Sequence, residues 1–245
     1  MKLARVQTET GPVSVVERGG VWESVEDIFA GELTFTGQQF PLTGISLLAP
    51  VRPTVLVGIS HNLGNNDHSL PIQAFLKSPR TIANPHDEVP LRADIGSVNM
   101  EVELAIVIGQ TAKHLTLENA LDCVFGYTIG NDVTNVDQVT IDEKFTQVKN
   151  GENYTPLGPW IETDLVEPGN RRMEIVVNNE VRRVSSTALL PSGLAEVLVY
   201  LTEWMELGPG DVILSGAPNT SVPVESGDVV ECMIEGLGTL TSKVS

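Results

Sequence analysis

The sequence predicts a mostly β protein with a few helices, of the α+β class, in two parts. Many short apolar stretches are separated by turn residues, and only two segments show helical spacing of apolar residues. The regular alternation of strands and helices that builds a parallel sheet is missing from the pattern. We therefore expect a β-rich barrel or roll at 50–245, preceded by a small β-rich domain at 1–49.

The N-terminal part begins with two strand candidates. "LARVQ" and "VSVVE" flank residues 8–12, which contain the turn-forming pair Gly11-Pro12 and suit a hairpin connection. Pro50 and Pro53 then stiffen the chain, and an apolar run from Val55 starts a new strand. This change from short strands to a proline-stiffened linker and a new apolar strand places the domain boundary near residue 50.

Two segments are predicted to be helical. The first covers about 117–125, with Thr116 as N-cap and Gly126 as terminator. The second covers about 193–207, where apolar residues recur at steps of three and four and Gly208-Pro209-Gly210 ends the pattern.

The remaining apolar stretches are predicted strands. Asn178-Asn179 between two of them suits a tight hairpin turn, because Asn tolerates positive φ. The candidates are 102–108, 127–130, 173–177, 181–184, 211–215 and 228–234.

Composition limits the possible partners. Fifteen Lys and Arg oppose 32 Asp and Glu, a net charge of −17, which disfavours nucleic acid and anionic membranes and attracts cations to carboxylate clusters. No segment is apolar for long enough to span a membrane, so we expect a soluble cytoplasmic protein. Cys123 and Cys232 lie in apolar surroundings and are predicted to be reduced, buried thiols.

The stretch "NMEVELAIVIGQ" places Glu101 and Glu103 directly before a strongly apolar run. Residues two apart in a strand share one face, so the two carboxylates project together. By itself the pattern favours an edge strand whose solvated face begins with two acids. A buried pair of like charges would need a cation between its members.

A third acid occurs in "GYTIGNDVT", where Asp132 follows another apolar strand. A strand–helix–strand excursion would return this segment beside the first strand and bring Asp132 near the two glutamates. Three carboxylates suit Mg²⁺, Mn²⁺ or Ca²⁺, whereas no His or Cys stands at the spacing that zinc requires. Spacing alone leaves open that Asp132 belongs to an Asn-Asp turn.

Seven motifs in order resemble the fumarylacetoacetate hydrolase family over about 50–244. They are "LLAPVRP" leading into "VGIS", "AFLKSP", "EVELAIVIG", "GYTIGNDVT", "TPLGPWIETD", "LGPGDVILSGAP" and "GDVVECMIEGLGTL". The resemblance implies a β-roll fold, a small N-terminal domain and a homodimer. It also implies that Glu101, Glu103 and Asp132 bind Mg²⁺ or Mn²⁺, which replaces the solvated-edge interpretation.

The resemblance further implies the chemistry. A metal with open positions chelates a 2-oxo acid and stabilises the enolate that forms when a C–C or C–H bond breaks. Hydrolases, decarboxylases and isomerases of the family share this intermediate, and the surrounding acid and base groups select the outcome.

Hydrolytic family members carry a His in the loop after the first strand, with a Glu partner further on. Here that loop is "VGISHNLGNNDHSLPIQAFLKSP", and Gly64 stands where the His is expected. His61 or His68 is a candidate for a displaced catalytic base. The alternative is that both histidines are polar residues of a loop rich in Gly, Asn and Asp.

Candidate binding residues for an acidic substrate are the cations near these motifs. Lys77 and Lys149 match the family's lysines, with Lys149 also a catalytic candidate, and Arg80 is close in sequence. Ser215 and Ala217 lie in "SGAP", where the family has Thr-Gly-Thr-Pro, so a hydroxyl donor is lost and substrate preference is expected to differ.

These departures set the functional hypotheses. The leading one is a metal-dependent isomerase or decarboxylase of a 2-oxo or 2-hydroxymuconate-type dicarboxylate, because the hydrolytic His–Glu pair is missing. The alternative enzyme is a C–C hydrolase of acylpyruvates or fumarylacetoacetate-like β-diketo acids. A catalytically degenerate metal-binding member is the alternative from another class, kept open by Ala217 and by Val136, which replaces a family Arg.

Overall fold

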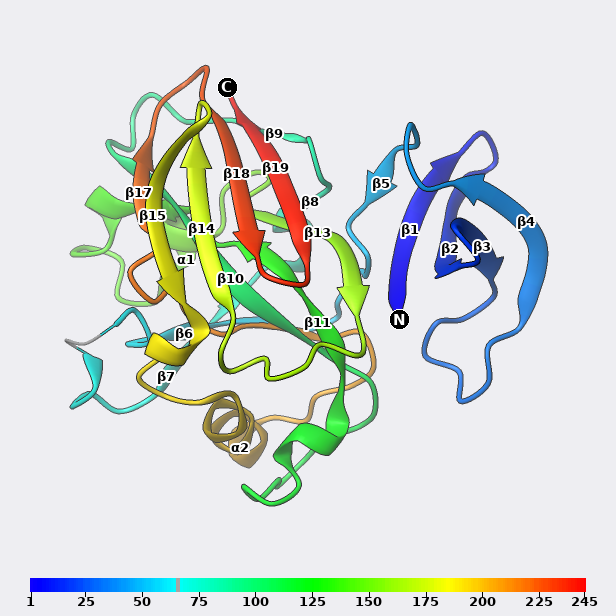
Figure 1. Cartoon of the computed structure of the whole chain (residues 1–245). Helices are drawn as coiled ribbons and strands as arrows, with labels where there is room; N and C mark the ends of the chain where they lie inside the picture. Colours follow the sequence, from blue (N-terminus) through cyan, green and yellow to red (C-terminus); the bar gives the residue numbers. More distant parts are fainter. Residues whose placement is uncertain (65–66) are drawn as a thin grey trace.

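The computed structural model describes residues 1–64 and 67–245 and is mostly β (Figure 1). In this part of the chain, strands form a 14-stranded sheet and a 5-stranded sheet. The main path of hydrogen-bonded neighbouring strands in the larger sheet has the order β4-β3-β2-β1-β13-β11-β10-β16-β6-β7. The smaller sheet runs in the order β15-β14-β18-β19-β9.

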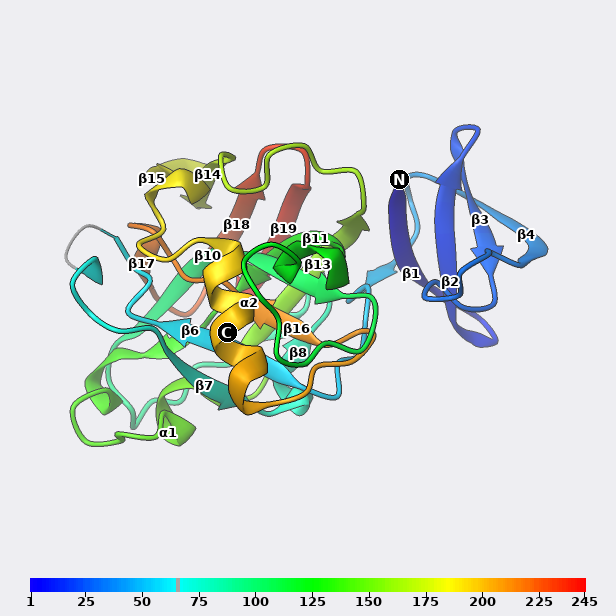
Figure 2. The ribbon, with the colours of Figure 1, turned by 90° about the horizontal axis from the view of Figure 1, so that it is seen from below.

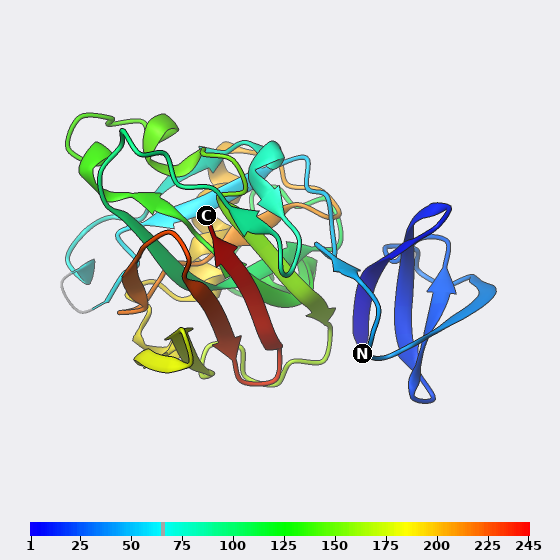
Figure 3. The same cartoon turned by 90° about the horizontal axis from the view of Figure 1, so that it is seen from above.

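Residues 1–49 form a small twisted set of strands beside the main body (Figure 1, Figure 3). The predicted first hairpin is present, since Thr8 pairs with Gly11. The first strand also pairs with a strand of the main body through Lys2↔Glu162 and Leu3↔Ile161, so the sheet continues across the predicted boundary. The strands are β1 (Lys2–Thr8), β2 (Gly11–Arg18), β3 (Val21–Val25), β4 (Phe35–Pro41) and β5 (Leu47–Leu48).

The chain from residue 50 onward, here called the main body, contains the remaining strands of the larger sheet. Its longest strand, β10, is central, because it pairs with four others. The strands are β6 (Leu56–Ser60), β7 (Gln73–Lys77), β8 (Ile82–Ala83), β10 (Val98–Ile108), β11 (Val124–Asn131), β12 (Thr134–Asn135), β13 (Thr155–Glu162), β16 (Val212–Leu214) and β17 (Ser221–Val224).

The smaller sheet packs across the larger one and contains the predicted hairpin. Asn178 and Asn179 both have positive φ, 52° and 64°, as the tight turn requires. The strands are β9 (Glu88–Val89), β14 (Arg172–Val177), β15 (Glu180–Ser186), β18 (Val229–Ile234) and β19 (Gly238–Val244).

One predicted helix is confirmed and the other is wrong. Helix α2 (Leu194–Trp204) lies along one end of the main body, as seen from below in Figure 2. The segment 117–125 instead contains a short 3-10 helix, Ala120–Cys123, followed directly by β11. Leu121 is exposed and Val124 joins the strand, because pairing with β10 outweighs a helical pattern only two turns long. The other α-helix, α1, is a single turn, Thr146–Lys149.

Apolar side chains pack on both faces of β10. Leu104 and Ile106 belong to the large core between the sheets, whereas Ala105 and Val107 belong to a second core with β13 and β16 residues. Cys123 and Cys232 are free and buried, as predicted. Among the described residues, no helix has the length and apolar character needed to cross a membrane.

Candidate active site

Glu101 and Glu103 lie on the central strand, not on a solvated edge. Their side chains are 6% and 2% exposed, so the edge interpretation of the pattern is wrong. Glu103 stands opposite Gly130 of β11, a residue without a side chain. A Cβ at Gly130 would lie 2.4 Å from a methyl of Leu214, so the packing beneath the carboxylates needs glycine there.

Asp132 joins the two glutamates because β11 runs antiparallel to β10. Its amide donates to the Glu101 carbonyl at 2.9 Å, and the Asn131 side chain accepts from the Glu101 amide at 3.1 Å. Asp132 is fully buried. One carboxylate oxygen from each of the three acids lies within 4.8 Å of the others, as the sequence argument expected.

Lys149 reaches this cluster from the end of α1. Its Nζ donates to Glu101 Oε2 at 3.0 Å and to Asp132 Oδ2 at 2.5 Å. It also donates at 2.5 Å to the hydroxyl of Thr134, which in turn donates to Glu101 Oε2 at 3.1 Å. Lys149 therefore ties two of the three carboxylates together.

Lys77, the last residue of β7, reaches the cluster from the other side. Its Nζ donates to Asp132 Oδ1 and, at 2.8 Å, to the carbonyl of Tyr154. Lys77 is 2% exposed, so it is a buried lysine and not a solvated surface residue. Asp132 thus lies between two ammonium groups.

Burial and neighbouring charges shift the pKa values of the cluster, upward for some residues and downward for others. Burial, reinforced by the Asp132 carboxylate, raises the pKa of Glu103 well above its ordinary value. Burial acts in the same direction on Asp132, but Lys149 and Lys77 outweigh it and lower that pKa. Burial lowers the pKa of Lys77, whereas at Lys149 it is outweighed by Asp132 and Glu101, which raise the pKa.

The donor set fits a hard divalent cation. When all three carboxylates are ionised, the two ammonium groups leave one negative charge uncompensated in a buried site, and an unpaired buried charge is costly. Carboxylate oxygens are the ligands that Mg²⁺, Mn²⁺ and Ca²⁺ prefer. Glu101, Glu103 and Asp132 are the residues able to hold such an ion.

The loop after β16 is bound tightly to the cluster. The Gly216 amide donates to Glu103 Oε2 at 2.6 Å, and Asn62 Nδ2 donates to the Ser215 carbonyl at 2.7 Å. Gly216 has φ +112°, and a Cβ there would lie 2.4 Å from the Asn62 carbonyl oxygen. Glycine is therefore required for this amide to reach Glu103.

A cavity of about 620 Å³ opens above Glu101. That volume is typical of small-molecule sites, which span about 300–1,000 Å³. Ala217 of the "SGAP" loop is part of its wall. The described lining residues are Leu63, Gly64, Asp67, Glu101, Arg183, Ala217, Asn219 and Ser221.

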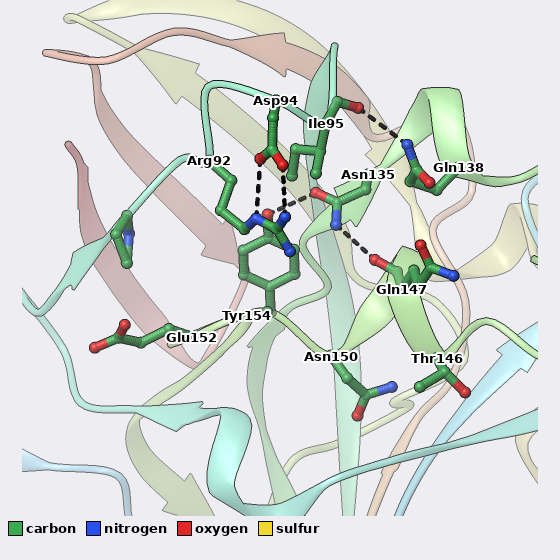
Figure 4. Close-up of a pocket in the computed structure, with 12 residues that line it drawn as sticks. Arg92, Asp94, Ile95, Asn135, Gln138, Thr146, Gln147, Asn150, Glu152 and Tyr154 are labelled. Atoms are coloured by element: carbon green, nitrogen blue, oxygen red, sulfur yellow. Dashed lines mark hydrogen bonds and ion pairs between the residues drawn. The ribbon is translucent and has the colours of Figure 1, made fainter.

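A second hollow, of about 470 Å³, lies beside Tyr154 and Asn135 (Figure 4). The Tyr154 hydroxyl donates to Asn135 Oδ1 at 2.5 Å, and Asn135 Nδ2 donates to the Gln147 carbonyl at 2.6 Å. Arg92 at its rim is already paired with Asp94 at 2.7 Å. The described lining of this hollow contains none of the three clustered carboxylates, whereas Glu101 lines the larger cavity.

The other predicted site residues lie apart from the carboxylates. His61 contacts the Pro71 carbonyl at 3.2 Å, His68 is exposed, and neither lines the cavity above Glu101 in the described structure. Arg80 is exposed, and no ion pair of the described residues includes it. The Ser215 hydroxyl is buried without a hydrogen-bond partner among the described residues.

Comparison with known families agrees with this geometry. The family model described as Fumarylacetoacetate (FAA) hydrolase C-terminal matches residues 57–245. The chain belongs to the fumarylacetoacetate hydrolase family. A second model, described as Rv2993c-like, N-terminal, matches residues 1–50.

Relatives of known sequence span most of the chain. The protein Rv2993c of Mycobacterium tuberculosis is 38% identical over 87% of this chain and 84% of its own length. Maleylpyruvate hydrolase of Aquipseudomonas alcaligenes is 39% identical over 68% of this chain and 58% of its own length.

Solved structures of the fumarylacetoacetate hydrolase family share the fold. The 5-carboxymethyl-2-hydroxymuconate delta-isomerase of Mycobacterium smegmatis has a TM-score of 0.92 and 36% identity, covering 100% of this chain and 99% of that one. Maleylpyruvate hydrolase of Sphingobium sp. SYK-6, solved with manganese (II) ion and pyruvate, has a TM-score of 0.82 and 26% identity. The match covers 100% of this chain and 98% of that one.

Four residues of this fumarylacetoacetate hydrolase site were not predicted from the sequence. Thr134 and Tyr154 hold the two lysines, and Asn62 and Gly216 hold the loop against Glu103. Thr134 is the last residue of "GNDVT" and lies two residues after Asp132. This spacing could have identified Thr134 as a site residue. The other three act through backbone groups or long-range contacts, which sequence spacing does not indicate.

Proposed function

We propose that this protein is a divalent-metal-dependent enzyme that converts a 2-oxo or 2-hydroxymuconate-type dicarboxylate through an enolate, as an isomerase or decarboxylase. The supporting observation is the buried cluster of Glu101, Glu103 and Asp132, which is braced by two lysines and reaches the cavity through Glu101. Isomerisation and decarboxylation require proton transfer but no activated water, which fits a cavity whose described lining lacks histidine.

Glu101, Glu103 and Asp132 hold the ion in this proposal, with Mg²⁺ or Mn²⁺ favoured over Ca²⁺. When bound, the ion supplies a Lewis acid that stabilises negative charge on the substrate oxygens. Lys149 keeps its proton, because Asp132 and Glu101 stabilise the ammonium, and so orients both carboxylates and adds positive charge beside the substrate. Lys77 holds Asp132 from the opposite side.

Two comparisons support this assignment. The isomerase of Mycobacterium smegmatis shares the fold over the full chain, and the manganese–pyruvate complex of the Sphingobium enzyme pairs the ion with a 2-oxo acid. Extending both properties to this chain is part of the proposal.

The test is turnover of two substrate types by one preparation. 2-Hydroxyhepta-2,4-dienedioate and an acylpyruvate are each supplied with Mg²⁺, Mn²⁺ or a chelator, and products are followed by absorbance and NMR. We expect isomerisation or decarboxylation of the dienedioate that stops in chelator and falls by about 100-fold or more in E101A. E203A, which changes an exposed glutamate of α2, is the matched control and keeps full activity.

The second candidate is C–C bond hydrolysis of acylpyruvates or similar β-diketo acids. It is favoured by the 39% identity to a maleylpyruvate hydrolase. Acylpyruvate cleavage without isomerase activity would establish this candidate and reject the first. Metal binding without turnover of either substrate would identify a degenerate member, and full activity in E101A would refute the metal assignment itself.

A further inference from the structure

The cavity above Glu101 is lined by an arginine that lies outside the seven motifs of the family resemblance. Arg183 lies on β15, in the smaller sheet, and lines the same cavity as Glu101 of the larger sheet. It is the one cationic side chain among the described lining residues. Glu101 and Asp67 supply the carboxylates of that lining, so the positive charge of Arg183 partly compensates their negative charge.

The fold directs this arginine toward the cavity. Arg183 and Ser185 are two residues apart on β15 and pair with Ile175 and Met173 of β14, so their side chains share a face. The Ser185 hydroxyl donates to the carbonyl of Pro218, in the loop that forms the cavity wall. That bond fixes β15 against the 217–219 loop, which lines the same cavity as Arg183.

The guanidinium retains most of its hydrogen-bonding capacity. Nη1 donates to the Arg182 carbonyl at 2.8 Å, and no ion pair of the described residues includes Arg183. An arginine has five N–H donors in a planar fork that matches a carboxylate. Other surface arginines of this acidic chain, such as Arg92 and Arg172, are paired with carboxylates at 2.7 and 2.6 Å.

Asn219 is another polar residue of the cavity lining. Its amide occupies the space that a side chain at Gly64 would fill, since a Cβ there would lie 2.8 Å from Asn219 Oδ1. The position where hydrolytic relatives are expected to carry a histidine is thus closed off by an amide. Asn219 and Arg183 therefore offer N–H donors in a lining whose carboxylates are Glu101 and Asp67, and the Asp67 carboxylate already accepts from the Leu63 amide at 2.8 Å.

We propose that Arg183 is the specificity-determining residue that binds the distal carboxylate of the substrate. A dicarboxylate whose 2-oxo acid end lies at the Glu101–Glu103–Asp132 cluster extends along the cavity toward Arg183. This inference rests on the proposed function, because it takes the cluster as the binding point of the 2-oxo acid end. In a chain of net charge −17, a second carboxylate needs such a local cation to enter.

The test compares two six-carbon probes that differ only at the distal end. Binding of 2-oxoadipate, which has a distal carboxylate, and of 2-oxohexanoate, which has a methyl, is measured by calorimetry on Mn²⁺-loaded protein. We expect R183Q to weaken 2-oxoadipate binding by about tenfold and to change 2-oxohexanoate binding by less than about twofold. Arg183 is exposed, so the variant is expected to fold, which its thermal melting curve verifies.

R182Q is the matched control. It removes the same charge from the next residue of β15, which does not belong to the described cavity lining, and is expected to leave both affinities unchanged. Equal losses in R182Q and R183Q, or equal losses for both probes, would overturn the role of Arg183 while leaving the metal site intact. Failure of both probes to bind the loaded wild-type protein would overturn the proposed function together with this inference.

Discussion

At the residue scale, the burial of Lys77 is the least expected feature of the site. A lysine is rarely this inaccessible unless its ammonium is fully paired, and here Asp132 and the Tyr154 carbonyl supply that pairing. The lysine contributes little net free energy in itself, because desolvation opposes the attraction. Its ammonium donates to Asp132 and favours the charged form of that carboxylate.

Removing the Lys77 ammonium leaves the negative charge of the Asp132 carboxylate partly uncompensated. We predict that K77M lowers the free energy of unfolding of the metal-free protein by about 3 kcal/mol, because breaking a buried pair exposes the cost of the remaining charge. Urea unfolding in chelator measures this. K113M is the control, since the Lys113–Glu206 pair is long, 3.9 Å, and exposed, and it is expected to change stability by less than about 0.5 kcal/mol. Equal stability of K77M and wild type would contradict the buried-pair account.

At the scale of elements, strand β10 determines the site and helix α2 supports it. β10 is paired along both edges, so its carboxylates cannot turn outward to solvent without breaking the sheet. The helix covers the large core on the far side, with Leu198 and Leu201 buried and Trp204 exposed. Its amphipathic pattern was sufficient to predict it, because eleven residues of helix present one continuous apolar face.

The helix prediction concerns this apolar face. We predict that L198A lowers the free energy of unfolding by about 2–5 kcal/mol, because it leaves a cavity beneath α2. W204A, on the exposed face of the same helix, is expected to change it by less than about 0.5 kcal/mol. Chemical denaturation of both variants measures the difference, and a similar loss in the two would mean that α2 does not pack by this face.

At the scale of the whole molecule, the two parts share one sheet. β1 of the N-terminal part pairs with β13 of the main body, and Leu3 packs in a core with Leu157 and Ile161. We propose that 1–49 and 50–245 are two domains joined through this strand pair. The edge strand β7 lies at the opposite end of the sheet with Leu76 exposed, which leaves an unpaired edge for another chain.

We also expect a homodimer in solution. Light scattering after size-exclusion chromatography should give about twice the chain mass of 26.4 kDa at micromolar concentration. The physical reason is that exposed apolar side chains on the main body, Leu76 and Ile141 among them, favour burial against a second copy. A mass equal to one chain over the accessible concentration range would reject the dimer.

The sequence by itself determined the β-rich class, helix α2, the residues of the carboxylate cluster and part of the strands, β10, β11, β14, β15, β16 and β18 among them. Strands β7, β13, β17 and β19 were not among the predicted ones. The predicted features follow from local periodicity and from motifs whose order along the chain is specific. The predicted helix at 117–125 failed because a pattern of two turns carries too little local free energy to compete with strand pairing.

Only the tertiary structure decided what surrounds the cluster. Spacing placed Glu101 and Glu103 on one face, but the burial of that face depends on β11 and β16, which pair with β10 from distant parts of the chain. The same holds for Arg183, whose approach to Glu101 depends on the packing of one sheet across the other. Long-range contacts of this kind have no local signature in the sequence, because each side chain acquires its partner only when the sheets assemble.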